Sequence, residues 1–259
     1  MAYSDRSYAR PYLGVPGLPT GVKWLIIINV AVFLIGWASP SINQQFIYFG
    51  SLIPAFVVTK FFLWTLVTYL FLHGGVWHIL FNMLSLWMFG ADLEQTWGTR
   101  NFLRFYFFCG AGAGVCVVLL NYIFKSPAVT VPTIGASGAI YGILLAWAVL
   151  WPDRIILMSF LFPIKVKYFV MIFGAIAFLN SFNFNSGVSE FAHLGGMLFG
   201  YIYLKSPSLG GRRRSVGSRG VNPIESMRQQ YAAWKLARAK KKFQVYLRKQ
   251  GRGGGPYVN

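Results

Sequence analysis

The chain has 259 residues, of which 56% are hydrophobic and only 12% are charged, and its formal net charge is +18. A soluble domain of this size carries about twice that charged fraction, so the composition argues against a soluble globular enzyme. We therefore predict an all-α polytopic membrane protein in which lipid solvates much of the apolar surface.

Six apolar segments come near the roughly 20 residues that a membrane-spanning helix needs. In chain order they cover residues 23–39, 75–91, 102–124, 136–151, 164–181 and 189–205. A further apolar stretch at 61–75 runs directly into the second segment, so the two cannot both cross the membrane. We therefore expect residues 40–74 to form a structured first loop that is partly embedded in the membrane and buried against protein.

The placement of lysine and arginine predicts the orientation. With the N-terminus in the cytoplasm, the external loops contain only Lys60 and Lys125, which agrees with the positive-inside rule. Both termini are then cytoplasmic, and we expect a multi-pass protein of a bacterial inner (cell) membrane. Alternatively, the first segment is a secretory signal cleaved near residues 36–38, but the long preceding region and bulky Trp37 favour a retained anchor.

The six spans divide the chain into three regions. Residues 1–22 form a cytoplasmic N-terminal segment, residues 23–205 the six-helix membrane core, and residues 206–259 a basic cytoplasmic tail. In the tail, Asn222, Pro223 and Glu225 suit the start of an amphipathic helix that binds anionic lipid. The alternatives are a solvated tail or one that binds RNA or protein. Because anionic lipid is the simpler partner beside membrane spans, no nucleic acid is expected.

Polar residues gather at the outer ends of the even-numbered spans. His78, Ser137 and His193 lie near the starts of the second, fourth and sixth segments, and His73 lies just before the second. Polar residues at membrane depth are rare and usually functional. The histidines and Ser137 are therefore the candidates for chemistry.

Glycine spacing suggests how Ser137 and His193 meet. Gly138 and Gly142 form one G-x-x-x-G ridge, and Gly196 and Gly200 form another on the segment that carries His193. If the ridges face each other, the backbones approach closely and Ser137 comes within hydrogen-bonding reach of His193. That arrangement is a nucleophile with its general base. On its own, Ser137 would be an ordinary packing residue.

Three further residues bear on this hypothesis. His78 and Asn82 are four residues apart, so they share one helix face and could stabilise a transition state. Glu190 is the one acid on the outer side and could approach His193, but we interpret it as a loop-end charge in water. A Ser–His dyad is therefore preferred to a triad.

Other membrane-protease chemistries fit less well. The H-E-x-x-H pattern of a common zinc site is absent, and we expect neither a metal nor a cofactor. An aspartyl mechanism needs two carboxylates that share a proton, whereas Asp92 and Asp153 lie at cytoplasmic ends.

Taken together, these motifs resemble the rhomboid family of intramembrane serine proteases over about residues 23–205. The residues that carry the resemblance are Gly135-Ala136-Ser137-Gly138 with Tyr141, then His193, Gly196 and Gly200, then His78 and Asn82, and the structural turn with Glu94, Gly98 and Phe102. One departure is Trp64-Thr65, where members of the family often have Trp-Arg.

The resemblance implies a serine endopeptidase that cleaves transmembrane segments of other membrane proteins. Ser137 would be the nucleophile, His193 the general base and acid, and His78, Asn82 and the Ser137 backbone N–H the oxyanion hole. Tyr141, Gly135, Gly138 and His73 would line the site. The alternatives are a non-catalytic rhomboid-like factor that binds helices and a small transporter, although no internal repeat typical of transporters is present.

Overall fold

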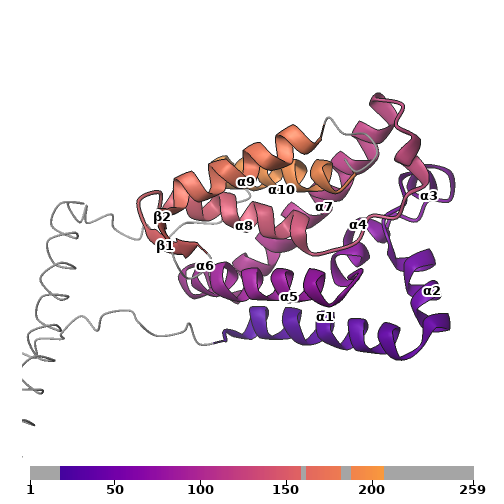
Figure 1. Cartoon of the computed structure of the whole chain (residues 1–259), viewed down its shortest axis with the longest axis horizontal. Helices are drawn as coiled ribbons and strands as arrows, with labels where there is room; N and C mark the ends of the chain where they lie inside the picture. The colour runs from indigo at the N-terminus through magenta and orange to yellow at the C-terminus, as the bar shows by residue number, and fades with distance from the viewer. Residues whose placement is uncertain (1–17, 159–161, 182–187, 207–259) are drawn as a thin grey trace, which may run out of the picture. The chain divides into compact units, whose positions relative to one another are not determined.

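The computed structural model describes residues 18–158, 162–181 and 188–206, and these ranges are mostly helical (Figure 1). This confirms the predicted helical class. The amphipathic helix predicted for the basic tail, and most of the predicted N-terminal segment, lie outside the described residues.

The helices follow the predicted segments closely. In chain order they are α1 (Thr20–Ala38), α5 (Val76–Ser85) continued by the π-helical η2 (Leu86–Gly90) and α6 (Ala91–Trp97), α7 (Thr99–Ile123), α8 (Ser137–Leu150), α9 (Val166–Asn180) and α10 (Val188–Lys205). The main difference is that the second helix continues past residue 91 to Trp97, where Gly98 ends it with a φ of 78°.

Three of the helices described are long and apolar enough to cross a membrane: Thr20–Ala38, Val76–Trp97 and Thr99–Ile123. Helices α8 and α9 are apolar but shorter, and α10 has Glu190 in its first turn, with His193 three residues further along. The protein is therefore an integral membrane protein, while a total of six spans stays a prediction.

The predicted first loop is built from short helices. They are α2 (Pro40–Gly50), α3 (Pro54–Thr59), α4 (Thr65–Thr68) and the 3-10 helix η1 (Tyr69–Phe71). Leu52 and Thr133 exchange two backbone hydrogen bonds of 3.0 and 2.9 Å, which tether this loop to the segment before α8. That segment also contains the 3-10 helix η3 (Pro127–Thr130). The loop therefore lies at the same end of the molecule as the start of α8.

A short hairpin corrects the all-α prediction. Strands β1 (Ile155–Met158) and β2 (Phe162–Lys165) are antiparallel, with Ile156 opposite Ile164. No clear sequence pattern predicts these strands, because each has only four residues and β2 contains Pro163, a residue that is uncommon within strands. In Figure 1 the hairpin and α6 lie at one end of the helices, opposite to α2 and α3.

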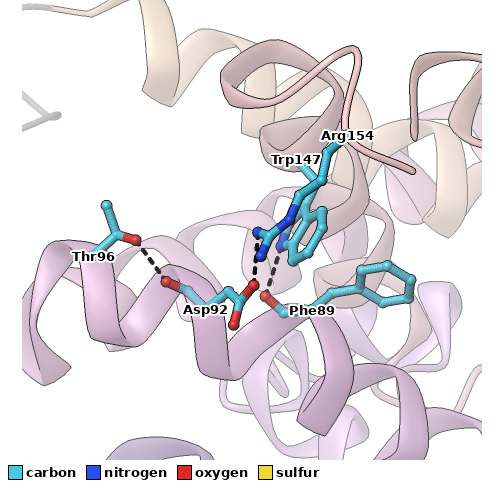
Figure 2. Close-up of polar contacts among 5 residues, drawn as sticks. All are labelled: Phe89, Asp92, Thr96, Trp147 and Arg154. Carbon is cyan, nitrogen blue, oxygen red and sulfur yellow. Dashed lines mark hydrogen bonds and ion pairs between the residues drawn. The ribbon is translucent and has the colours of Figure 1, made fainter. Parts of the chain in front are cut away.

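Hydrogen bonds and an ion pair connect the helices at the end of the molecule where the hairpin lies (Figure 2). Arg154 donates to Asp92 Oδ2 over 2.8 Å, and Trp147 Nε1 donates to the carbonyl oxygen of Phe89 over 2.8 Å. The Arg154 guanidinium also lies 4.7 Å from the Trp147 ring centroid, as in a cation–π contact. These contacts join the end of α8 and the start of the hairpin to η2 and α6.

Glu94 holds the start of α1 at the same end. Its carboxylate accepts the backbone N–H groups of Gly21 and Val22, each over 2.7 Å, and the hydroxyl of Thr99 over 2.6 Å. The first N–H groups of a helix have no partner within the helix, so a buried carboxylate there satisfies two of them. Glu94 thus serves the structural role expected of the turn around it.

Candidate active site

Two glycine ridges bring α8 and α10 into backbone contact. A Cβ atom placed on Gly196 would lie 1.8 Å from the carbonyl oxygen of Gly138, and one on Gly200 would lie 3.2 Å from the Cα of Gly142. No side chain fits at Gly196, and one at Gly200 would press against the backbone of Gly142. The facing ridges predicted from the glycine spacing are therefore confirmed.

This close packing sets Ser137 beside His193. Ser137 is the first residue of α8, and its Oγ lies 2.9 Å from His193 Nε2 on α10. The Tyr141 ring, one turn further along α8, stacks on the imidazole with centroids 4.1 Å apart and an interplanar angle of 9°. The imidazole is thus held between a hydroxyl and an aromatic face.

The second ring nitrogen of His193 also has a partner, which differs from our sequence interpretation. Glu190 Oε2 lies 3.1 Å from His193 Nδ1. The two side chains are only 18% and 15% exposed, so Glu190 is not a loop-end charge in water. The difference arises because α10 begins at Val188, which places Glu190 and His193 on one helix face, three residues apart.

His78 and Asn82 converge on the backbone just before Ser137. A Cβ atom on Gly135 would lie 2.7 Å from His78 Nε2 and 3.8 Å from Asn82 Nδ2. Gly135 has a φ of 119°, a conformation that side chains rarely allow. Asn82 is buried and its Nδ2 donates to the carbonyl oxygen of His78 over 3.0 Å. Two side-chain N–H donors thus approach the start of α8.

Tyr69 fixes this stretch of backbone, and sequence reasoning missed it. Its carbonyl oxygen accepts the N–H of Gly135 over 2.9 Å, and its hydroxyl donates to the carbonyl oxygen of Gly110 over 2.8 Å. A Cβ atom on Gly138 would lie 3.1 Å from that hydroxyl. No pattern marks Tyr69, because it is one aromatic residue among many in an apolar loop.

His73 lies beside His78. The two rings are 5.0 Å apart between centroids and meet edge to face. Burial, and to a smaller extent the neighbouring His78, lowers the pKa of His73 to about 4. His73 is therefore uncharged at neutral pH and packs against His78 as a neutral ring.

The acidic residues other than Glu190 in the part of the chain that the structure describes have their partners elsewhere. Asp92 pairs with Arg154, and Asp153 pairs with Lys165 and Lys167 over 3.1 and 3.0 Å, all near the hairpin. Among the residues described, no group of three or more histidine, cysteine or acidic side chains could hold a metal ion. The chemistry that these residues suit is nucleophilic attack by a serine.

A family model for the Rhomboid domain matches residues 60–206. The chain belongs to the rhomboid family. All of the residues that converge on Ser137, from Tyr69 to His193, lie inside the matched region of this rhomboid.

Several curated relatives are similar to it. Rhomboid protein 1, mitochondrial, of Saccharomyces cerevisiae is 33% identical over 187 residues, which are 69% of this chain and 51% of the relative. RHOMBOID-like protein 1 of Arabidopsis thaliana is 32% identical over 183 residues, which are 66% of this chain and 42% of the relative. The rhomboid protease AarA of Providencia stuartii is 31% identical over 216 residues, which are 77% of this chain and 75% of the relative. The chain thus spans about half the length of the first two relatives.

Proposed function

We propose that this rhomboid is an intramembrane serine endopeptidase that cleaves transmembrane segments of other membrane proteins near the outer membrane face. The observation that carries the proposal is the 2.9 Å contact between Ser137 Oγ and His193 Nε2, made by residues of separate helices. The relative AarA, which is named a rhomboid protease, supports the same activity.

In the proposed reaction, Ser137 Oγ attacks the scissile carbonyl while His193 Nε2 accepts the hydroxyl proton. The negative charge that develops on the carbonyl oxygen is stabilised by His78, by Asn82 and by the backbone N–H of Ser137. That N–H lies at the start of α8, where N–H groups are free of helix partners and the helix dipole is positive. His193 then gives its proton to the leaving amine, and water hydrolyses the acyl-enzyme.

The substrate helix has to unwind locally, because its own backbone hydrogen bonds shield the scissile carbonyl from attack. We therefore propose cleavage close to helix-weakening residues, at a small residue. The positive-inside pattern of the sequence puts this chemistry near the outer surface, with both termini cytoplasmic. A bacterial inner membrane remains our prediction, since the relatives include mitochondrial proteins as well as a bacterial protease.

Labelling with a fluorophosphonate tests the nucleophile directly. Purified wild-type protein in detergent should be labelled, and Ser137→Ala should lose both the label and the cleavage of a transmembrane substrate. Ser85→Ala is a matched control, because Ser85 lies on α5 about two turns beyond His78. Cleavage that persists in Ser137→Ala would refute the assignment.

The same experiment separates the enzyme from its two rivals. A helix-binding factor or a transporter would retain binding or transport in Ser137→Ala and would show no serine-dependent label in the wild type. A comparison of membrane proteins released by wild-type and Ser137→Ala cells would then identify substrates.

A further inference from the structure

Glu190 is a carboxylate close to the reacting residues that the dyad mechanism does not use. It lies in the first turn of α10, where a negative charge is favoured by the helix dipole. Its Oε2 atom is 3.1 Å from His193 Nδ1, and the side chain is only 18% exposed. Among the described residues, the other acids that form ion pairs, Asp92 and Asp153, do so with lysine or arginine at the hairpin end.

The chemistry of the three groups fixes the location of the histidine proton. A carboxylate can only accept a hydrogen bond, so His193 Nδ1 must carry the proton that it shares with Glu190. The lone pair is then on Nε2, which is the nitrogen 2.9 Å from Ser137 Oγ. This is the tautomer that a general base needs in order to accept the serine proton.

We propose that Glu190 is a positioning residue that holds His193 in this tautomer and stabilises the imidazolium formed when Ser137 attacks. The site would then operate as a Ser–His–Glu triad. The inference rests on the proposed protease function and deepens it.

Protons balance without any transfer to the carboxylate. The Ser137 hydroxyl proton moves to Nε2 as the Oγ–carbon bond forms, and Nδ1 keeps its own proton throughout. The imidazolium carries one positive charge beside the Glu190 carboxylate until Nε2 delivers its proton to the leaving amine. Glu190 thus acts on the charged intermediate and on ring orientation, while Tyr141 supports the ring face.

A merely structural role for Glu190 predicts different behaviour. A charge that only complements the α10 dipole would be replaced well by aspartate, which keeps the charge in the first turn. Aspartate is one methylene shorter, so it withdraws the carboxylate from Nδ1. Glutamine retains a hydrogen-bond acceptor near Nδ1 but has no charge to stabilise an imidazolium.

The test measures the rate of fluorophosphonate labelling of the full chain in detergent micelles for wild type, Glu190→Gln, Glu190→Asp and Glu190→Ala. General acid–base groups contribute about 10²–10⁴ in rate, and we expect the Gln and Ala variants to label about 10- to 100-fold more slowly than wild type. Glu190→Asp should also be slowed, with an unchanged melting temperature. Asp92→Asn is the matched control, because it removes an ion-paired carboxylate at the other end and should leave the labelling rate of folded protein unchanged.

A spectroscopic measurement reports on the ring itself. The chain has three histidines, so ¹⁵N-labelled histidine gives few signals, and His193 is assigned by comparison with a His193→Gln sample. In wild type the proton should be on Nδ1, and in Glu190→Ala the proportion protonated on Nε2 should rise.

The outcomes separate this inference from the proposed function. Wild-type labelling rates in the Gln and Ala variants, with an unchanged tautomer in the Ala variant, would overturn the role of Glu190 and leave the protease intact. That role would also be overturned if the Gln and Ala variants lost labelling only in proportion to a loss of folded protein, and if Glu190→Asp labelled at the wild-type rate. If wild type is not labelled at all, the protease proposal fails, and the tautomer measurement still decides what Glu190 does to His193.

Discussion

Two acid–base pairs lie at opposite ends of the described helices. Asp92 and Arg154 are 2.8 Å apart near the hairpin, and Glu190 and His193 are 3.1 Å apart near the start of α8. Both pairs are at least partly buried, and their distances are similar. They differ in the base, since arginine keeps its proton in proteins whereas histidine exchanges one near neutral pH.

The surroundings of Arg154 and His193 also suit these different roles. Arg154 is enclosed by Asp92 and by the rings of Trp147 and Trp151, which lie 4.7 and 5.6 Å from its guanidinium. His193 has Nδ1 on Glu190 and Nε2 on Ser137, so Nε2 can accept and return a proton while Nδ1 stays hydrogen-bonded to the carboxylate. A contact between a carboxylate and a nitrogen base therefore joins helices at one end of the molecule and is suited to support proton transfer at the other.

The largest effect should come from the glycine contact that positions the site. In Gly196→Ala the new methyl group would collide with the Gly138 carbonyl oxygen and push α10 away from α8. A displacement of about 1 Å costs on the order of 10²-fold in rate, so labelling of Ser137 should fall by at least about 100-fold, with a lower melting temperature.

Gly174→Ala is the control for this substitution. A Cβ atom there would meet only Met197 Sδ at 3.4 Å and Met197 Cε at 3.5 Å, which are atoms of a flexible side chain. Alanine also costs less than glycine within a helix. Labelling and stability equal to wild type in Gly196→Ala would contradict the close packing of the two helices.

The next effect should come from Asn82. Its amide donates to the carbonyl oxygen four residues earlier over 3.0 Å, and Asn101, near the hairpin end, makes the same contact with Trp97 over 3.0 Å. If Asn82 also stabilises the oxyanion, Asn82→Ala should lower turnover by about 100-fold with little loss of folded protein. Asn101→Ala should leave turnover unchanged. Equal effects of the two substitutions on turnover would mean that Asn82 is a packing residue.

The Asp92–Arg154 pair should affect stability and not chemistry. Asp92→Asn removes one partner of a partly buried pair, in which the side chains are 10% and 38% exposed. We expect the free energy of unfolding to fall by about 1–2 kcal/mol, discounted for the exposure of Arg154. The labelling rate per folded molecule should stay at the wild-type value. A fall in that rate, measured at a temperature where the variant is folded, would show that the two ends are coupled.

The sequence predicts most of the helix positions and much of the candidate site. There is a physical reason why the roles of two residues were not predicted. The helix positions, the facing glycine ridges and the approach of Ser137 to His193 all follow from apolar length and residue spacing. Glu190 was misjudged because its interaction depends on whether the helix starts before or after it, and helix boundaries are the least certain part of a sequence pattern. Tyr69 was missed because it acts through its backbone carbonyl, which every residue has.

The smallest effect should come from Asp153, which offers a second ion-pair comparison at the hairpin end. Hydrogen bonds from Lys167 and Lys165 lower the pKa of Asp153 below its ordinary value of 3.8, but its side chain is 52% exposed. A depressed carboxyl pKa contributes stability above the unfolded pKa and loses it as the pH falls through the folded value. Solvent screens this exposed site, so Asp153→Asn should lower the melting temperature only slightly at pH 7 and not at all once the pH is well below 3.8. If Asp153→Asn lowered the melting temperature more at low pH than at pH 7, the predicted direction of the pH dependence would be wrong. If it destabilised the protein as much as Asp92→Asn, burial would not explain the difference between the two ion pairs.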